Sequence, residues 1–591
     1  MAPDPAPPAA AGHPPALIRR FWAAASGFWK GDTRVRAWTL TLGLALVTLC
    51  QIAVQYRVNF WTRDIFDAVE QRNAPGLRHQ ALLLLPLTLA TVSLAVAAVY
   101  GRMSMQREWR AWLVNRLIGR WAKRGRPQAL NLVSGDHQVP EGRITDDARI
   151  ATDAPVDFVV GLFNACISAA TFIGILWVVG GALDVTVGTR TLHLPGFLVL
   201  SVILYSALVT LAMIVFTRRF TSVSESINQA EAEFRYALTH VRENSERIAL
   251  LGSEEEERKG LRGALGEVIG RWRRYCGQHM RVTIVSNSNM LVAGVLPVFL
   301  CMPRFLKGQM SLGEVTQAAA AFVQLQSSFN WLVDNFARFA DCRASARRVG
   351  TLLASLDTLW RSEQDTGPGR ITRLEADGVA LRLQDLAITH DRGQVVLDTA
   401  DIVIGCGERV RFVGTSDSGK AALLHALAGL SDAGEGRIGA GRGLRRFVLS
   451  QNPFVPLGTL RRVACYPTPT DHVPDERLRA LLVATGLAAL IGRLDDDAPW
   501  EQLLGDGERQ RLGLVRACIA APDILLIDDA LSALDPERQR RLLAWLLGQL
   551  PRAAILNLTR HEEPDVLFER TLRFTVQSSR EPAPLKPPAA G

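Results

Sequence analysis

Long apolar runs in the first 340 residues are the feature that most restricts how this chain can fold. Six of them are long enough to cross a bilayer as a helix, which takes about 20 residues. They lie near residues 37–58, 80–101, 155–181, 195–217, 282–303 and 313–337. Because lipid offers no hydrogen-bond partner to backbone groups, such runs must be helical. The sequence therefore predicts an all-α transmembrane domain of six spans over residues 17–355.

The sixth run is the least apolar of the set. Its polar residues are Gln317, Gln324, Gln326, Asn330, Asp334 and Asn335. Polar groups at membrane depth face partner helices or a water-filled cavity. Together with Trp331, they predict a wet cavity in place of a lipid site. An amphipathic helix outside the membrane is the other interpretation of this run.

Basic residues indicate the orientation of the spans. Arginines are dense after the second span, between Arg102 and Arg126, and recur after the fourth and sixth spans, whereas the loop between spans three and four holds only Arg190. The positive-inside rule then places both termini in the cytoplasm. The same rule explains the net charge of +9 without a nucleic-acid partner. Leu17–Trp29 is predicted to be an interfacial elbow helix, which makes membrane lipid a partner.

The remaining segments outside the spans divide the chain. Residues 1–16 hold six prolines and six alanines and lack the basic start and apolar core of a signal peptide, so they are expected to be a disordered tail. Residues 579–591 are expected to be a second tail, and 356–375 a polar linker. Segments 102–153 and 218–278 are predicted to extend the membrane helices as stalks. The eight cysteines are scattered singly, which predicts neither disulfides nor a metal site.

Residues 376–578 show a different pattern, in which short Val/Ile/Leu runs alternate with helical stretches. This pattern predicts an α/β nucleotide-binding domain. The strand-like run 409–414 leads into a GxxxxGK loop and then an apolar helix, which is the order of a P-loop. Backbone N–H groups of such a loop cradle phosphates, and Lys420 is expected to reach the β/γ oxygens. The loop residues predicted to bind ATP are Gly414, Ser416, Ser418, Gly419, Lys420 and Ala421.

Four further motifs follow the P-loop. Four apolar residues end in Asp528, a predicted Mg²⁺ ligand, and Asp529, at the position of the catalytic base. Gly505 and Gly507 stand in a signature-like segment and Asp535 in a D-loop, all three predicted to contact the nucleotide. Gln451 stands as the Q-loop glutamine, with a predicted role in catalysis and in binding Mg²⁺. The expected cofactors are ATP and Mg²⁺.

The whole chain from about residue 20 to 575 resembles the fused permease–ATPases related to the SbmA/BacA peptide importers and to ABC subfamily D. In the membrane half the resemblance is carried by Asn59–Asp64, by Glu108–Leu113 and by the segments 231–257 and 296–345; in the second half it is carried by 451–461. The resemblance implies the ABC exporter-like fold for the six-span domain. It also implies a homodimer in the bacterial inner membrane, two ATP sites shared across the dimer and a large hydrophilic cavity. A heterodimer stays open. It also implies import of peptides, or of cobalamin-like or bleomycin-like hydrophilic solutes.

Several positions depart from the family pattern. Ala421 replaces the Ser or Thr whose hydroxyl binds Mg²⁺, Gly505 replaces the signature serine, and Asp506 follows it. Asp529 replaces a glutamate, and ungapped alignment puts Arg560 where the H-loop histidine belongs, with His561 one residue later as the candidate catalytic histidine. These departures predict a weakened, degenerate ATP site.

Three functions are compatible with this combination of motifs. The first is an ATP-driven importer of peptides or similar hydrophilic solutes. The second is a proton-coupled transporter with a vestigial or regulatory nucleotide-binding domain, whose proton carriers would be chosen from the carboxylates Asp334, Glu233, Asp64 and Asp67. The third is a nucleotide-sensing membrane protein that transports nothing.

Overall fold

The computed structural model divides the chain into two compact units, residues 1–358 and 359–591, each described here by itself. The structure describes residues 14–123, 126–127, 130, 140–187, 190–217, 220–364, 369–376, 378–390, 393–397, 399–414, 417–559 and 566–577. The predicted tail 579–591 and residues 1–13 of the N-terminal tail lie outside this set.

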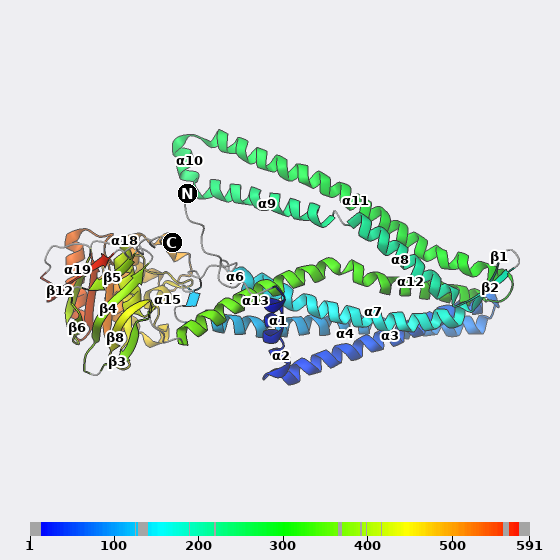
Figure 1. The fold of residues 1–591 in the computed structure, drawn as a ribbon, viewed down its shortest axis with the longest axis horizontal. Coiled ribbons are helices and arrows are strands. Elements are labelled where there is room, and N and C mark those ends of the chain that lie inside the picture. Colours follow the sequence, from blue (N-terminus) through cyan, green and yellow to red (C-terminus); the bar gives the residue numbers. More distant parts are fainter. Residues whose placement is uncertain are drawn as a thin grey trace, which may run out of the picture. The chain divides into compact units, whose positions relative to one another are not determined.

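The first unit is built almost entirely of helices (Figure 1). Along the chain they are α1 (Pro14–Ala25), α2 (Gly27–Lys30), α3 (Arg34–Glu70), α4 (Ala74–Trp121), α6 (Pro140–Gly142), a π-helical turn (Arg143–Asp147), α7 (Ala148–Gly180), α8 (Phe197–Thr217), α9 (Phe220–Glu243), α10 (Ser245–Leu251), α11 (Glu254–Leu306), α12 (Leu312–Asp334) and α13 (Phe336–Gln364). An antiparallel hairpin of β1 (Ala182–Val187) and β2 (Arg190–Pro195) joins α7 to α8.

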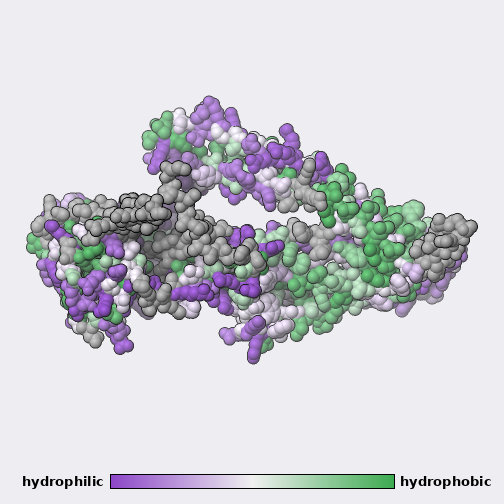
Figure 2. All heavy atoms as spheres, in the orientation of Figure 1, coloured by the Kyte–Doolittle hydropathy of each residue, from purple (hydrophilic) through white to green (hydrophobic). Residues whose placement is uncertain are grey.

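Five helices of the described residues are long and apolar enough to cross a membrane: α3, α4, α7 with the preceding turn, α8 and α11. The predicted spans 37–58, 80–101 and 282–303 lie within α3, α4 and α11, and the predicted spans 155–181 and 195–217 match α7 and α8 to within two residues. On α4 the side chains of Leu82, Leu85 and Leu89 are each at least two-thirds exposed. An apolar stripe of this size favours contact with lipid over contact with water. Figure 2 shows apolar residues over α8 and the adjoining parts of α11, and hydrophilic residues over α9.

The sixth predicted span is α12, which is not among the five apolar helices. The helix packs against α3, α7, α8 and α11, so its neighbours are protein. Ala318, Phe322 and Leu325 are fully buried and share a core cluster with Phe172 and Leu198. A helix enclosed in this way does not need an apolar surface all round, which accounts for the polar residues that its sequence contains.

Helices α9, α10 and the first half of α11 form an arm. α9 and α11 pack side by side, and Figure 1 shows this pair standing away from α3, α4 and α7. The tip of the arm is α10, where Leu250 and Leu251 are 81% and 80% exposed. The continuity of α11 and of α4 beyond their apolar segments agrees with the predicted stalks.

The second unit contains a ten-stranded sheet in the order β3-β8-β4-β5-β12-β7-β11-β10-β9, with β6 paired to β4. Its strands are β3 (Thr372–Glu375), β4 (Leu381–His390), β5 (Gly393–Leu397), β6 (Asp401–Ile404), β7 (Arg409–Val413), β8 (Gly434–Ala440), β9 (Arg446–Leu449), β10 (Ile524–Asp528), β11 (Ala554–Thr559) and β12 (Arg570–Gln577). The path from β12 to β9 is parallel, and β4 pairs antiparallel with β5, β6 and β8.

Helices cover the parallel strands and complete the predicted α/β class. They are α14 (Asp417–Ala428), α15 (Leu460–Cys465), α16 (Asp475–Ala484), α17 (Trp500–Leu503), α18 (Asp506–Ala520) and α19 (Pro536–Gln549), with 3₁₀ turns at Thr470–His472 and Ala488–Arg493. Two apolar cores stabilise this unit. One contains the fully buried Phe412 and Leu423, and the other contains Trp500 and Leu546. Because parallel strands end at one edge, the loops after β7 and β10 meet there.

Candidate functional site

The glycine loop begins where β7 ends. Gly414 follows Val413, and α14 starts at Asp417, so the predicted strand–loop–helix order is confirmed. A Cβ atom on Gly414 would lie 2.2 Å from the Phe574 ring, and one on Gly419 would lie 2.7 Å from Val576. Both contacts are with β12, and both are too close for any other residue to fit without a shift. Ser418 and Ala421 lie in α14, and Ser416 lies outside the described residues.

Lys420 lies in the first turn of α14 and is buried. Its Nζ is 3.0 Å from Asp528 Oδ1 and also forms an ion pair with Asp529. Burial lowers the pKa of Lys420, but hydrogen bonds to Asp529 and Asp528, with their negative charges, outweigh it, so the pKa is raised. The lysine is therefore a cation held by two carboxylates, and phosphate oxygens must compete with both.

The two carboxylates lie at the end of β10, between β9 and β11. Ile524 to Ile527 are buried, and Asp528 emerges at the strand's carboxyl end. Asp529 follows with φ +42°, a left-handed conformation that aspartate tolerates better than most residues. This turn directs both acids to the same lysine. The Asp528 carboxylate is the kind of oxygen ligand that Mg²⁺ takes, so this residue could hold the ion. Gln451, the other predicted ligand, follows β9 and has an exposed side chain.

Gln510 connects two of the predicted motifs, a role that the sequence did not reveal. The residue is buried in α18. Its Nε2 donates to the backbone carbonyl of Gln451 at 3.0 Å and to Ser532 Oγ at 3.4 Å, and its Oε1 accepts from the backbone N–H of Ala533 at 3.0 Å. The Gln451 segment and the segment before Asp535 are thus tied through one side chain. An amide between two arginines, Arg509 and Arg511, gives no sequence signal of burial.

Replacing Gln510 with leucine is expected to lower the stability of the second unit by about 2–3 kcal/mol, because it leaves the Gln451 carbonyl and the Ala533 N–H unpaired. Thermal unfolding of the purified full chain measures this as a lower Tm. Gln502→Leu, an exposed position in α17, is the matched control. Equal Tm values for the two variants would show that the link carries no stability.

Arg516, also in α18, holds the loop that follows Gln451. Its Nε donates to the carbonyl of Val463 at 2.7 Å, and its Nη1 donates to the carbonyl of Phe454 at 2.6 Å. Burial lowers the pKa of Arg516 to about 10. The side chain thereby fixes the loop between Gln451 and α15 against the helix that starts at the signature.

The signature segment forms the start of α18. Gly505 is its N-cap, and its backbone N–H donates to Glu508 Oε2 at 3.1 Å. Asp506 forms an ion pair with Arg509, one turn on, and is 69% exposed. Its carboxylate stabilises the positive end of the helix, which is where an anionic ligand would bind. A Cβ atom on Gly507 would lie 3.1 Å from Leu534, so the segment packs closely on the D-loop.

The Asp535 side chain caps α19, because its Oδ1 accepts a hydrogen bond from the backbone N–H of Arg538 at 2.9 Å. Within the described residues, no hydrogen bond or ion pair joins the Gly505–Gly507 segment to Lys420. The structure therefore brings Lys420, Asp528 and Asp529 together and leaves the signature as a second, separate surface of this chain. His561 and Arg560 lie outside the described residues.

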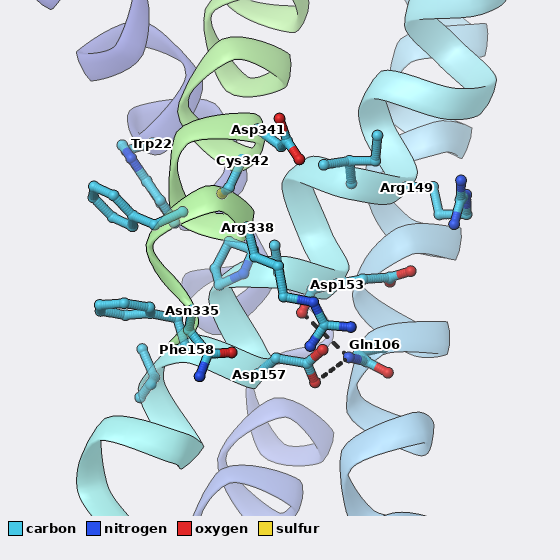
Figure 3. Close-up of a pocket in the computed structure, with 15 residues that line it drawn as sticks. Trp22, Gln106, Arg149, Asp153, Asp157, Phe158, Asn335, Arg338, Asp341 and Cys342 are labelled. Atoms are coloured by element: carbon cyan, nitrogen blue, oxygen red, sulfur yellow. Dashed lines mark hydrogen bonds between the residues drawn. The ribbon is translucent and has the colours of Figure 1, made fainter. Parts of the chain in front are cut away.

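A cavity of about 430 Å³ lies in the first unit, between α1, α4, α7 and the start of α13 (Figure 3). Gln106 Nε2 donates to Asp157 Oδ1 at 2.8 Å, and Arg102 lies 3.5 Å from the same oxygen. Figure 3 shows Arg338 pointing toward Asp157 and Gln106, with Trp22 on the opposite side. This cavity carries both signs of charge beside an aromatic wall.

Comparison with known proteins assigns most of the chain to two families. Residues 31–306 match the family described as ABC transporter transmembrane region 2, and residues 397–532 match the family described as ABC transporter.

Several known proteins match more than nine-tenths of this chain. The inner membrane ABC transporter ATP-binding protein YddA of Escherichia coli is 24% identical over 92% of this chain and 95% of its own length. The chloroplastic ABC transporter D family member 2 of Arabidopsis thaliana is 24% identical over 91% and 83%. The lysosomal cobalamin transporter ABCD4 of Mus musculus is 23% identical over 92% and 93%.

Proposed function

Because the chain belongs to the ABC transporters, with a transmembrane region fused to an ATP-binding domain, we propose that it imports peptides or other hydrophilic solutes across the bacterial inner membrane. The observation that carries the proposal is the polar, protein-enclosed α12. Gln317 and Gln326 are buried in a helix packed among apolar spans. Polar side chains at membrane depth face the interior of the helix bundle or a water-filled cavity, and a passage for hydrophilic solutes would be lined from the same interior. Cobalamin, the solute named for one relative, belongs to the same solute class.

We favour ATP as the energy source for import, bound and slowly hydrolysed at a site that lacks some of the usual catalytic groups. Lys420 and Asp528 retain the charges that bind phosphate and Mg²⁺. Ala421 supplies no hydroxyl to the metal, and Asp529 contacts Lys420 itself. A base engaged by a buried lysine is poorly placed to activate water, which supports slow hydrolysis.

Proton coupling with a regulatory nucleotide-binding domain is the second candidate, and one observation favours it. Of the four carboxylates considered as proton carriers, three are engaged: Asp64 lies 3.6 Å from Arg57, Asp67 accepts from the Gly313 N–H at 3.0 Å, and Glu233 accepts from Gln229. Asp334 has no hydrogen bond or ion pair to its side chain among the described residues. It is the acid most available to bind a proton.

A homodimer, with a heterodimer as the alternative, is the proposed assembly. Two exposed leucines in α10 at the tip of the arm, Leu250 and Leu251, form an apolar surface of the kind that marks a protein or membrane contact. A second copy of the chain would cover this tip. The separation of the signature surface from Lys420 supports the same assembly, because the signature of one copy would then face the P-loop of the other.

Uptake into reconstituted vesicles tests the function, with ATP and a proton gradient supplied separately. We expect a labelled tripeptide or cyanocobalamin to accumulate when ATP is present on the side of the nucleotide-binding domain. Uptake driven by the proton gradient alone would select the second candidate. No accumulation under either condition would refute import of these solutes.

A further inference from the structure

Polar residues on one face of α12 form a line directed at α8 and α11. Gln326, Asn330 and Asp334 are spaced four residues apart, so they lie on the same face of the helix. At the Gln326 end of the line, Gln326 Nε2 donates to Asn289 Oδ1 at 3.0 Å, and Tyr205 OH donates to the same oxygen at 2.9 Å. The line thus begins in a satisfied polar cluster between the three helices.

At the other end of the line, Asn330 and Asp334 border a cavity of about 160 Å³. Its polar lining comes from Thr210 of α8, Ser286 and Asn289 of α11, and Asn330 and Asp334 of α12. Asn330 Oδ1 is buried there with no hydrogen-bond partner among the described residues. Among the described residues that line the cavity there is no Lys, Arg or His, and Asp334 contributes the one charged group of that lining.

The chemistry of this lining selects a cationic hydrogen-bond donor. Buried acceptors without donors cost free energy, and a carboxylate near membrane depth costs more until a cation pairs with it. Asn330 Oδ1 and Asp334 are acceptors, whereas an anion would meet the carboxylate's repulsion. An ammonium or guanidinium group has N–H donors for both and a charge that matches Asp334.

We propose that this cavity is the subsite for a cationic side-chain head, ammonium or guanidinium, of the transported solute. The inference rests on the proposed import of peptides and hydrophilic solutes. The volume suits one head group and not a whole peptide, and Val209, Met213 and Val285 provide apolar walls for its aliphatic stem. Asp334 is exposed, so its carboxylate is accessible to a solute.

The cavity lies where three helices meet, since α12 contacts both α8 and α11. A cation that bridges Asp334 of α12 to oxygens of α11 holds these helices together. Solutes with a cationic head are therefore preferred over neutral solutes of the same size.

Uptake of two matched tripeptides, Ala-Lys-Ala and Ala-Gln-Ala, by proteoliposomes of the full chain tests the subsite. Wild type is expected to prefer the lysine peptide, and Asp334→Asn is expected to lower that preference about tenfold or more, because a charge-assisted hydrogen bond contributes about 1.5–3 kcal/mol. Asp32→Asn, an exposed aspartate in the turn before α3, is the control and should keep the preference.

The outcomes separate the subsite from the transport function. If wild type takes up neither peptide, the proposed function fails for peptides. If both enter equally and Asp334→Asn changes neither, transport stands and the subsite is refuted. If Asp334→Asn lowers both peptides equally and abolishes dependence on the proton gradient, Asp334 is a proton carrier, and the subsite is again refuted.

Discussion

Replacing Lys420 with alanine is expected to weaken ATP binding by at least about 30-fold. Truncating one partner of a buried, hydrogen-bonded charge pair costs about 2–5 kcal/mol, and each 1.4 kcal/mol is a factor of ten. In this chain the loss has a second part. Without the lysine, Asp528 and Asp529 have no cation at their side and repel the incoming phosphates. Titration of the purified full chain with a fluorescent ATP analogue measures the effect.

Arg442→Ala is the matched control, because it removes an exposed cation from the same unit, 3.7 Å from Glu375. It should leave the affinity for the ATP analogue unchanged. Equal affinity in the Lys420 variant and wild type would mean that the glycine loop does not hold nucleotide, and would favour a membrane protein driven without ATP.

The apolar helices were predictable because their signal is local. A run such as 80–101 is apolar along its length, and α4 contains it with leucines exposed. α12 differs because its neighbours are other helices. Which of its faces meets α8, α11, α3 or α7 depends on packing, so the sequence predicted a wet helix but could not identify the cavity beside Asn330 and Asp334.

In the nucleotide site, too, the residues in local motifs were predictable, whereas the contacts between distant segments were not. Gly414, Lys420 and Asp528 stand next to the strands that position them, and their sites followed from strand–loop–helix order. The Lys420–Asp529 contact joins positions 109 residues apart and requires β7, β11 and β10 to lie in this order in the sheet. The hydrogen bonds of Gln510 were equally unpredictable from the sequence, because its partners lie in two other loops.

Replacing Asp529 with glutamate is expected to raise the rate of ATP hydrolysis by about 10²–10⁴, the range that a well-placed general base contributes. The added methylene lengthens the side chain, so that its carboxylate need not remain in the contact that Asp529 now makes with Lys420. The left-handed backbone at φ +42° favours aspartate over glutamate, so a small loss of stability is expected with the gain in rate. Phosphate release by the full chain in proteoliposomes measures the rate.

Ala421→Ser combined with Asp529→Glu should give a further increase, since the serine hydroxyl adds a ligand for Mg²⁺ beside the phosphates. Asp471→Glu, which adds the same methylene at an exposed position, should change nothing. The Lys420→Ala change in the double variant should abolish the gain if hydrolysis occurs at this site.

If wild type already hydrolyses ATP as fast as Asp529→Glu, then Asp529 acts as a full base and the site is not weakened. If neither variant exceeds wild type, the base position does not limit the rate, and the limit must lie in the signature or in the segment 560–565.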